Sequence, residues 1–142
     1  MDSRSFEAAA PAEPCNLKLI RGFFEAVFHR AGLDGVDELL LALDEACANV
    51  VRHRSGDVDD GVIRVRAELD QREVRLRVVR FCGEHDVPNI KPHECTDERP
   101  GGFGTGFITR IMDRVQYVRQ SPPSHFVDLL MTKRLESDGA SR

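Results

Sequence analysis

Hydrophobic residues recur at helical spacing in the first part of the chain. In one segment they stand at positions i, i+3, i+4, i+7 and i+8, occupied by Ile20, Phe23, Phe24, Val27 and Phe28. This spacing places them on one helix face and predicts a helix from about Leu17 to Ala31. Asn16 is the expected N-cap, and Gly32 is expected to end the helix.

A second helical pattern follows, in which hydrophobic residues are spaced by four, three and four, at Leu39, Leu43, Ala46 and Val50. We expect Asp34 or Asp37 to cap this helix and the segment 55–57 to close it. Cys47 falls on its buried face, where a thiol serves as a small apolar side chain.

Glu45 and Asn49 interrupt the hydrophobic face of this second helix. Because they are four residues apart, their side chains stack on one side of the helix. The Glu45 carboxylate could take a proton or orient a hydroxyl group, and the Asn49 oxygen could ligate a hard cation such as Mg²⁺. The alternative interpretation is that both residues lie on a solvated edge of the helix and have no special role.

Alternation of apolar and polar residues predicts strands elsewhere in the chain. Residues 63–69 and 74–78 alternate with period two, and residues 70–73 are long enough for a hairpin loop. Residues 115–119 and 126–131 predict two more strands, and a short edge strand around Ser5 to Ala8 is an option beside a loose N-terminus. The polar face of the hairpin is rich in arginine, which indicates either a solvated sheet face or a surface for an acidic protein partner.

Between the predicted hairpin and the last strands lies a segment without periodicity, from Gly83 to Pro100, which suggests a functional loop or lid over about 84–101. It runs into a glycine cluster that contains Gly102, Gly104, Thr105 and Gly106. A helical pattern starts directly afterwards, with Phe107, Ile108, Ile111, Met112 and Val115. A glycine loop that opens a helix can present backbone amides to phosphate oxygens, although this spacing matches neither the P-loop nor the dinucleotide fingerprint.

Length and charge limit the class of protein. The 142 residues predict a single domain over 1–142, and the net charge of −4 gives no indication of a nucleic-acid partner. No apolar run reaches the length of a membrane span, so we expect a cytoplasmic protein without membrane contact. Two cysteines and two histidines, Cys82, His85, His93 and Cys95, could together hold Zn²⁺, but their spacing fits no common zinc motif and a plain loop is the favoured interpretation.

Two segments together resemble a known family. The helix segment Glu45-Ala-Cys-Ala-Asn49-Val-Val-Arg-His53 looks like the N-box of the histidine-kinase-like (GHKL) ATPases, in the form found in bacterial anti-sigma factor serine/threonine kinases. The segment Gly102-Phe-Gly104-Thr-Gly106-Phe-Ile-Thr-Arg-Ile-Met-Asp113-Arg-Val115 resembles their second glycine box and the helix that it opens. The order of helices and strands also fits, over a core of about 17–135.

The resemblance implies an α/β fold, a two-layer α+β sandwich of the GHKL (Bergerat) type, with helices on one face of a mixed, mostly antiparallel sheet. It implies that ATP binds with Mg²⁺, that Asn49 ligates the metal, and that Glu45 is the general base. Gly83, Gly102, Gly104, Thr105 and Gly106 would contact the nucleotide, whereas His53 is expected to be structural. The implied partners are a sigma factor and a small STAS-type antagonist whose serine is phosphorylated, and a homodimer is left open.

One position departs from the family pattern. The family has an Asp two residues before a glycine at the end of the hairpin's second strand, and this Asp accepts the adenine amino group. Here Phe81 stands at that place when counted from Gly83, or Arg80 when the strand phase is followed. Glu84 and Asp86 are the nearest carboxylates, outside the expected position. An unpaired buried donor costs about 1–3 kcal/mol, which would weaken ATP binding roughly ten- to a hundredfold.

The sequence therefore leaves two functions open: a protein kinase that acts as an anti-sigma factor, or a binding-only switch of the same fold with weak or no ATP turnover.

Overall fold

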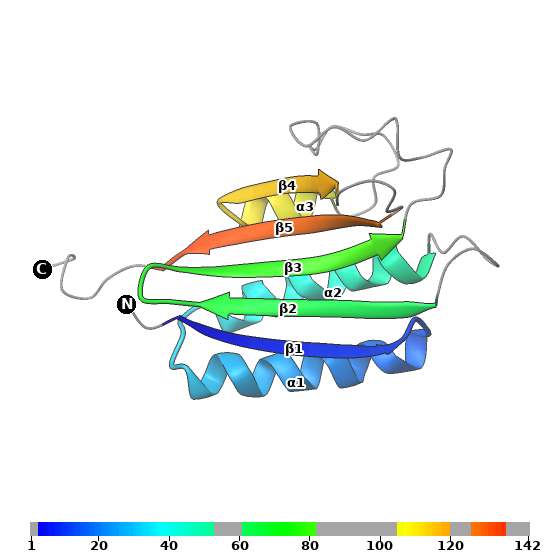
Figure 1. Cartoon of the computed structure of the whole chain (residues 1–142). Helices are drawn as coiled ribbons and strands as arrows, with labels where there is room; N and C mark the ends of the chain where they lie inside the picture. The colour runs from blue at the N-terminus through cyan, green and yellow to red at the C-terminus, as the bar shows by residue number, and fades with distance from the viewer. Residues whose placement is uncertain (1–2, 53–60, 82–104, 120–125, 136–142) are drawn as a thin grey trace, which may run out of the picture.

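The computed structural model describes residues 3–52, 61–81, 105–119 and 126–135, and its elements are labelled in Figure 1. The helices are α1 (Leu17–Arg30), α2 (Val36–Arg52) and α3 (Thr105–Ile111), with a short 3₁₀ turn, η1 (Pro14–Asn16), before α1. The strands are β1 (Arg4–Pro11), β2 (Val62–Leu69), β3 (Glu73–Phe81), β4 (Arg114–Arg119) and β5 (Phe126–Arg134).

The five described strands form one sheet in the order β1-β2-β3-β5-β4. Every pairing among them is antiparallel, and β3 lies in the middle between β2 and β5 (Figure 1). The N-terminal segment is thus an ordered edge strand, in register with β2 from Arg4 opposite Leu69 to Pro11 opposite Val62. The predicted strands are all present, and each extends beyond its predicted range, most of all β1, β3 and β5.

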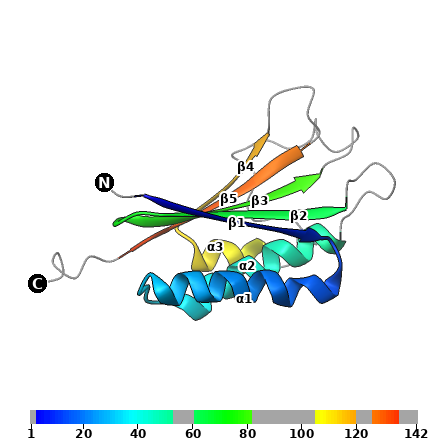
Figure 2. The ribbon, with the colours of Figure 1, turned by 60° about the horizontal axis from the view of Figure 1, so that its bottom comes forward.

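The three helices in the described part of the chain lie against the same face of the sheet, and α2 packs against both α1 and α3 (Figure 2). The core fills the space between the two layers. Its fully buried side chains come from both helices and strands, and the largest are Phe24, Phe28, Leu39, Leu40, Leu43, Ile63, Leu76, Ile108 and Met131. This arrangement confirms the two-layer α/β sandwich, with the opposite face of the sheet left uncovered by helices in the described part of the chain.

Most, but not all, of the hydrophobic residues predicted to form the buried face of α1 are buried. Ile20, Phe24, Val27 and Phe28 are buried, but Phe23 is 40% exposed because it lies at the edge of the hydrophobic face. Asn16 occupies the N-cap position without capping the helix through its side chain; its Nδ2 instead donates to the carbonyl of Pro11 at 2.9 Å. Gly32 ends the helix as predicted, with a φ of 73° that suits glycine.

Helix α2 begins at Val36, so the residue in front of it is Gly35. Neither Asp34 nor Asp37 therefore occupies the predicted N-cap position. Asp37 is therefore not a cap: it lies in the first turn with Glu38, where carboxylates interact favourably with the positive end of the helix. Helix α3 ends at Ile111, so Val115 belongs to β4 and not to the helical pattern.

The β2–β3 hairpin turns on Asp70. Its Oδ1 accepts the backbone N–H groups of Arg72 at 2.7 Å and Glu73 at 2.9 Å. These hydrogen bonds favour the charged carboxylate and lower the pKa of Asp70. The predicted loop at 70–73 is confirmed, with Glu73 already the first residue of β3.

Several expectations fall outside the described residues. They concern the end of the second helix at 55–57, His53, the lid at about 84–101, and the proposed zinc ligands Cys82, His85, His93 and Cys95. Among the described residues, no group of three or more His, Cys, Asp or Glu side chains is arranged to hold a metal ion. No described helix is both long and apolar enough to cross a membrane.

Candidate functional site

Glu45 and Asn49 lie on the exposed edge of α2, next to its buried face. Both are half-buried, and their neighbours Ala46, Cys47 and Val50 fill the core. A polar group at such an edge can reach a ligand while the helix behind it stays fixed by packing. The structure therefore places the two predicted site residues together on one rigid element, as their spacing predicts.

Arg52 joins these two side chains. Its Nη2 donates a hydrogen bond to Oδ1 of Asn49 and lies 3.9 Å from Oε1 of Glu45. One guanidinium nitrogen thus holds the oxygen that would ligate a metal and, more loosely, the carboxylate that would act as a base. A cation bound to Asn49 would stand next to this positive charge, so the two cannot occupy the oxygen together without strong repulsion.

The sequence reasoning did not single out Arg52, although a signal for it exists. Arg52 lies three residues after Asn49 and seven after Glu45, and these spacings put all three on one side of a helix. A long basic side chain at that position can reach back to both. The observed contacts make it part of the candidate site.

A second ion pair fixes the same turn of α2 to α1. Nε of Arg21 lies 3.2 Å from Oδ2 of Asp44, the residue before Glu45. Partial burial raises the pKa of Asp44, Arg21 opposes this shift, and the neighbouring Glu45 carboxylate adds to it. The neighbouring carboxylates of Asp44 and Glu45 thus repel each other, and each has its own arginine partner, Arg21 for Asp44 and Arg52 for Glu45.

Helix α3 packs beside α2, and it begins within the predicted glycine box. Ile108 and Met112 are buried in the core, and Nζ of Lys133 in β5 donates to the carbonyl of Ile111 at 2.9 Å. A cation at this end of a helix is favourable and fixes α3 to the sheet. Thr105 and Gly106 are the first two residues of α3. Gly83, Gly102 and Gly104 lie outside the described residues, so their nucleotide contacts stay predictions.

The position of the missing adenine acceptor lies at the end of β3. Both Arg80 and Phe81 belong to this strand, opposite Val127 and Phe126 of β5. The backbone places both at the strand end where the family pattern has its Asp, and neither is a carboxylate. The nearest carboxylates in the sequence, Glu84 and Asp86, lie outside the described residues.

Cys47 lies two residues from Glu45 but faces the core. Burial, with a smaller contribution from the Asp44 carboxylate, raises its pKa to about 12. Its thiolate is therefore about a thousandfold rarer than that of an ordinary cysteine, and iodoacetamide should label exposed Cys15 while sparing Cys47 in the folded protein. Mass spectrometry of the two peptides measures this, with labelling in urea as the control. Equal labelling of both peptides without urea would contradict the burial of Cys47.

Comparison with known proteins gives both a family, the histidine kinase-like ATPase domain, and individual relatives, which are named serine-protein kinase RsbW. The family described as histidine kinase-like ATPase domain matches residues 10–131. The serine-protein kinase RsbW of Bacillus velezensis is 27% identical over 93% of this chain and 86% of its own. The serine-protein kinases RsbW of Listeria monocytogenes (serotype 4a) and Bacillus subtilis are 30% and 25% identical, over 75% and 93% of this chain and 74% and 86% of theirs. With most of its length inside the matched region, this chain belongs to the histidine kinase-like ATPase domain family.

Proposed function

We propose that this protein is an ATP-dependent serine/threonine protein kinase that acts as an anti-sigma factor. It would bind a sigma factor and phosphorylate a serine of a small STAS-type antagonist, in the cytoplasm. The observation that carries the proposal is that Glu45 and Asn49 lie on one edge of α2 and both contact Arg52, in a chain similar to proteins named serine-protein kinase RsbW. ATP is the nucleotide expected from an ATPase domain.

The residues on α2 have the chemistry that such a reaction needs. Glu45 is a half-exposed carboxylate that can accept the proton of a serine hydroxyl as that oxygen attacks phosphorus. Asn49 offers a neutral oxygen, the type of ligand that Mg²⁺ uses together with phosphate oxygens. When bound, Mg²⁺ would neutralise charge on the phosphates. Thr105 and Gly106, with the glycines before them, are proposed to contact the phosphates.

Arg52 gives this site a defined resting arrangement. In the described state it satisfies Asn49 and partly neutralises Glu45, so neither group is ready for its proposed role. The phosphates of a nucleotide carry more negative charge than one carboxylate, and guanidinium groups bind phosphate oxygens well. We therefore propose that nucleotide binding draws Arg52 away from α2, which frees Asn49 for the metal and releases the Glu45 carboxylate from its ion pair.

The second candidate is a binding-only switch that keeps the fold but turns over little or no ATP. The observation that favours it is the end of β3, where Arg80 and Phe81 stand in place of the expected carboxylate. Loss of that acceptor affects nucleotide affinity, whereas Glu45 affects the chemical step. The two functions can therefore be separated by measuring affinity and phosphotransfer independently.

Substitution of Asn49 tests the metal site. Asn49→Ala should weaken Mg-ATP binding by about 10–100-fold, the loss typical of residues that support a metal site, and leave metal-free ATP binding nearly unchanged. Calorimetric titration of ATP with and without Mg²⁺ measures both affinities. Asn49→Asp, which keeps an oxygen at this position, is the matched control and should retain the dependence on Mg²⁺. Equal Mg-ATP affinity in Asn49→Ala and the parent protein would remove the proposed role of Asn49.

A further inference from the structure

Helix α1 is hydrophobic on a second side, which the core does not use. Leu19 and Phe23 are 68% and 40% exposed, and Gly22 and Ala26 beside them are exposed as well. Spacings of three and four residues place these four residues on one side of the helix, and we call them the α1 strip. The centre of the strip lies roughly 130° round the helix from the buried face that contains Phe24. A continuous hydrophobic strip at helical spacing is typical of a surface that binds another helix.

Leu41 on α2 shows the contrasting case of a single exposed hydrophobic residue. It is 40% exposed, as Phe23 is. Its neighbours one turn away on α2 are all acidic, namely Asp37, Glu38, Asp44 and Glu45. Single exposed hydrophobic side chains are normal on protein surfaces and indicate no partner. Leu41 therefore serves as an internal control for the α1 strip.

The α1 strip lies on the free flank of the helical layer. Helix α2 packs against both α1 and α3, so α1 is at one end of this layer, beside the edge strand β1 (Figure 1, Figure 2). Arg21 lies on the side of α1 that meets α2, where it pairs with Asp44. The strip lies almost opposite Arg21 round the helix. A partner can therefore reach the strip without touching the candidate site on α2.

Gly22, in the middle of α1, has no explanation among the described residues. Apart from its two neighbours and the backbone of its own helix, a Cβ atom at this position would meet no described atom within 4 Å, so alanine would fit. Glycine inside a helix is destabilising relative to alanine. On the surface of a helix, glycine allows the backbone of another element to approach closely. Gly22 thus indicates a close contact that the single chain does not make.

We propose that the α1 strip packs against the same strip of a second copy of this chain, with the two α1 helices antiparallel. The order of large and small residues fits this arrangement. In the antiparallel pair, Leu19 stands opposite the partner's Ala26, and Phe23 stands opposite the partner's Gly22. A twofold axis relates the two chains, so each contact occurs twice. A parallel pair would instead place Leu19 against Leu19 and Phe23 against Phe23.

The charged residues beside the strip favour the same occupant. Lys18 and Glu25 lie on the side of α1 away from the core, seven residues apart. In the antiparallel pair, Lys18 comes within reach of the partner's Glu25, and Glu25 within reach of the partner's Lys18. Within the single chain, Glu25 lies 3.9 Å from Nε2 of His29, which is charged only when protonated. The strip and its flanking charges are therefore both complementary to a second copy of themselves.

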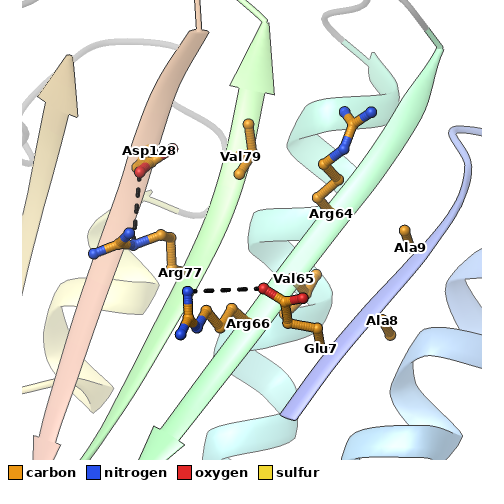
Figure 3. A pocket seen from close by; sticks show the side chains of 9 residues that line it. All are labelled: Glu7, Ala8, Ala9, Arg64, Val65, Arg66, Arg77, Val79 and Asp128. Carbon is orange, nitrogen blue, oxygen red and sulfur yellow. Dashed lines mark ion pairs between the residues drawn. The ribbon is translucent and has the colours of Figure 1, made fainter. Parts of the chain in front are cut away.

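The uncovered face of the sheet is a second surface on which another chain could dock. It contains a hollow of about 470 Å³ lined by residues of β1, β2, β3 and β5 (Figure 3). Charged residues at this hollow pair with each other, since Arg66 lies 3.8 Å from Glu7 and Arg77 lies 3.6 Å from Asp128. These ion pairs favour neither an acidic nor a basic partner, so the hollow does not define an occupant as the α1 strip does.

The full chain without nucleotide is sufficient for the test, so the result does not depend on the kinase proposal. One pair of helices makes a small interface, and such a dimer should be weak and form only at high protein concentration. Sedimentation equilibrium from low micromolar to near-millimolar protein measures the dimerisation constant. Unfolding measured well below the dimerisation range concerns the single chain.

Two matched substitutions test the hydrophobic strip. Leu19→Gln should weaken the dimer about tenfold or more, because each chain loses the burial of one leucine. Leu41→Gln makes the same chemical change at the isolated position on α2 and should leave the dimerisation constant unchanged. Circular dichroism of each variant verifies that the fold is intact.

Gly22→Ala should change the stability of the single chain and that of the dimer in opposite directions. The melting temperature of the dilute protein should rise, because alanine is the better helix former. The dimer should weaken, because the added methyl groups hold the two helices apart. A variant that only disturbed the fold would instead lower both.

A charge exchange tests the second copy and its direction. Lys18→Glu and Glu25→Lys should each weaken the dimer, because each brings like charges together twice. An equimolar mixture of the two variants should restore it, since one chain then carries two acidic residues at these positions and the other carries two basic ones. Native mass spectrometry identifies the mixed dimer, and high salt should weaken it.

Four results would overturn the proposal. The first is a parent protein that stays monomeric at every concentration. The second is a dimer that Leu41→Gln weakens as much as Leu19→Gln does. The third is a mixture of Lys18→Glu and Glu25→Lys that forms no mixed dimer. The fourth is a dimer that Arg64→Glu dissociates and Leu19→Gln does not, which would assign the interface to the uncovered face of the sheet.

Discussion

Glu45→Ala should reduce transfer of phosphate to the antagonist serine by about 10²–10⁴-fold, the usual contribution of a general base. Its affinity for Mg-ATP should stay within a few-fold of the parent protein. The reason is that a base acts on the serine proton in the transition state, so its loss raises the barrier without removing a contact to bound nucleotide. Radioactive phosphate transfer at saturating ATP measures the rate, and calorimetry measures the affinity.

Glu45→Gln is the matched variant, because it keeps the shape of the side chain and removes only its basicity. It should lose as much rate as Glu45→Ala. Recovery of most of the rate in Glu45→Gln would mean that Glu45 positions Arg52 or Asn49 and does not accept a proton. If the parent protein itself transfers no phosphate at millimolar ATP with its cognate antagonist present, the kinase proposal fails and the binding-only switch takes its place.

A substitution of Glu45 also changes the environment of Arg52, which contacts both Glu45 and Asn49. Removal of the carboxylate also removes the ion pair between Arg52 and Glu45, while the hydrogen bond from Arg52 to Asn49 stays. If Arg52 then bound Asn49 more tightly, the affinity for Mg²⁺ would fall. If Arg52 moved away from Asn49, the affinity for Mg²⁺ would rise. Parallel measurement of Mg²⁺ dependence in the parent and both Glu45 variants separates this effect from the loss of the base.

Local patterns were sufficient to predict most of the fold. The spacing in α1 and α2 and the alternation in β2 and β3 are dictated by which side chains must reach the core, so they are visible in the sequence. The sequence does not decide whether strand β1 forms, because Ala8, Ala9 and Ala10 have little strand preference; pairing with β2 decides its conformation. The exposure of Phe23 is not predictable from the sequence either. Periodicity shows which side of a helix is hydrophobic, but not how far burial extends around the helix.

The candidate site was predictable only in part. The spacing of Glu45 and Asn49 places them on one side of a helix, and the structure agrees. The contacts of Arg52 and the ion pair between Arg21 and Asp44 depend on where long side chains reach and how α1 packs on α2, which periodicity does not define. The hollow on the sheet is a third case, because it arises from the register that puts Ala9 and Val79 beside Arg64.

The adjacent pair Phe23 and Phe24 provides a test of the fold with its own control. Phe24 is fully buried between α1 and the rest of the core, whereas Phe23 is 40% exposed. Phe24→Ala should lower the free energy of unfolding by about 3–5 kcal/mol, because it removes a buried ring and leaves a cavity that the packed core cannot fill. Urea denaturation measures the change, and an unaltered m-value would verify that the unfolded states are comparable.

Phe23→Ala makes the same chemical change one position earlier and should have a much smaller effect. The two rings contact each other edge to face, with centroids 4.8 Å apart, so Phe23→Ala loses this contact, worth about 0.5–1.5 kcal/mol, and some partial burial. The better helix propensity of alanine offsets part of the loss. A large difference between the two variants would locate the core on the Phe24 side of α1. Equal destabilisation would mean that Phe23 is also covered in the folded protein, and α1 would then pack differently from the arrangement in Figure 2.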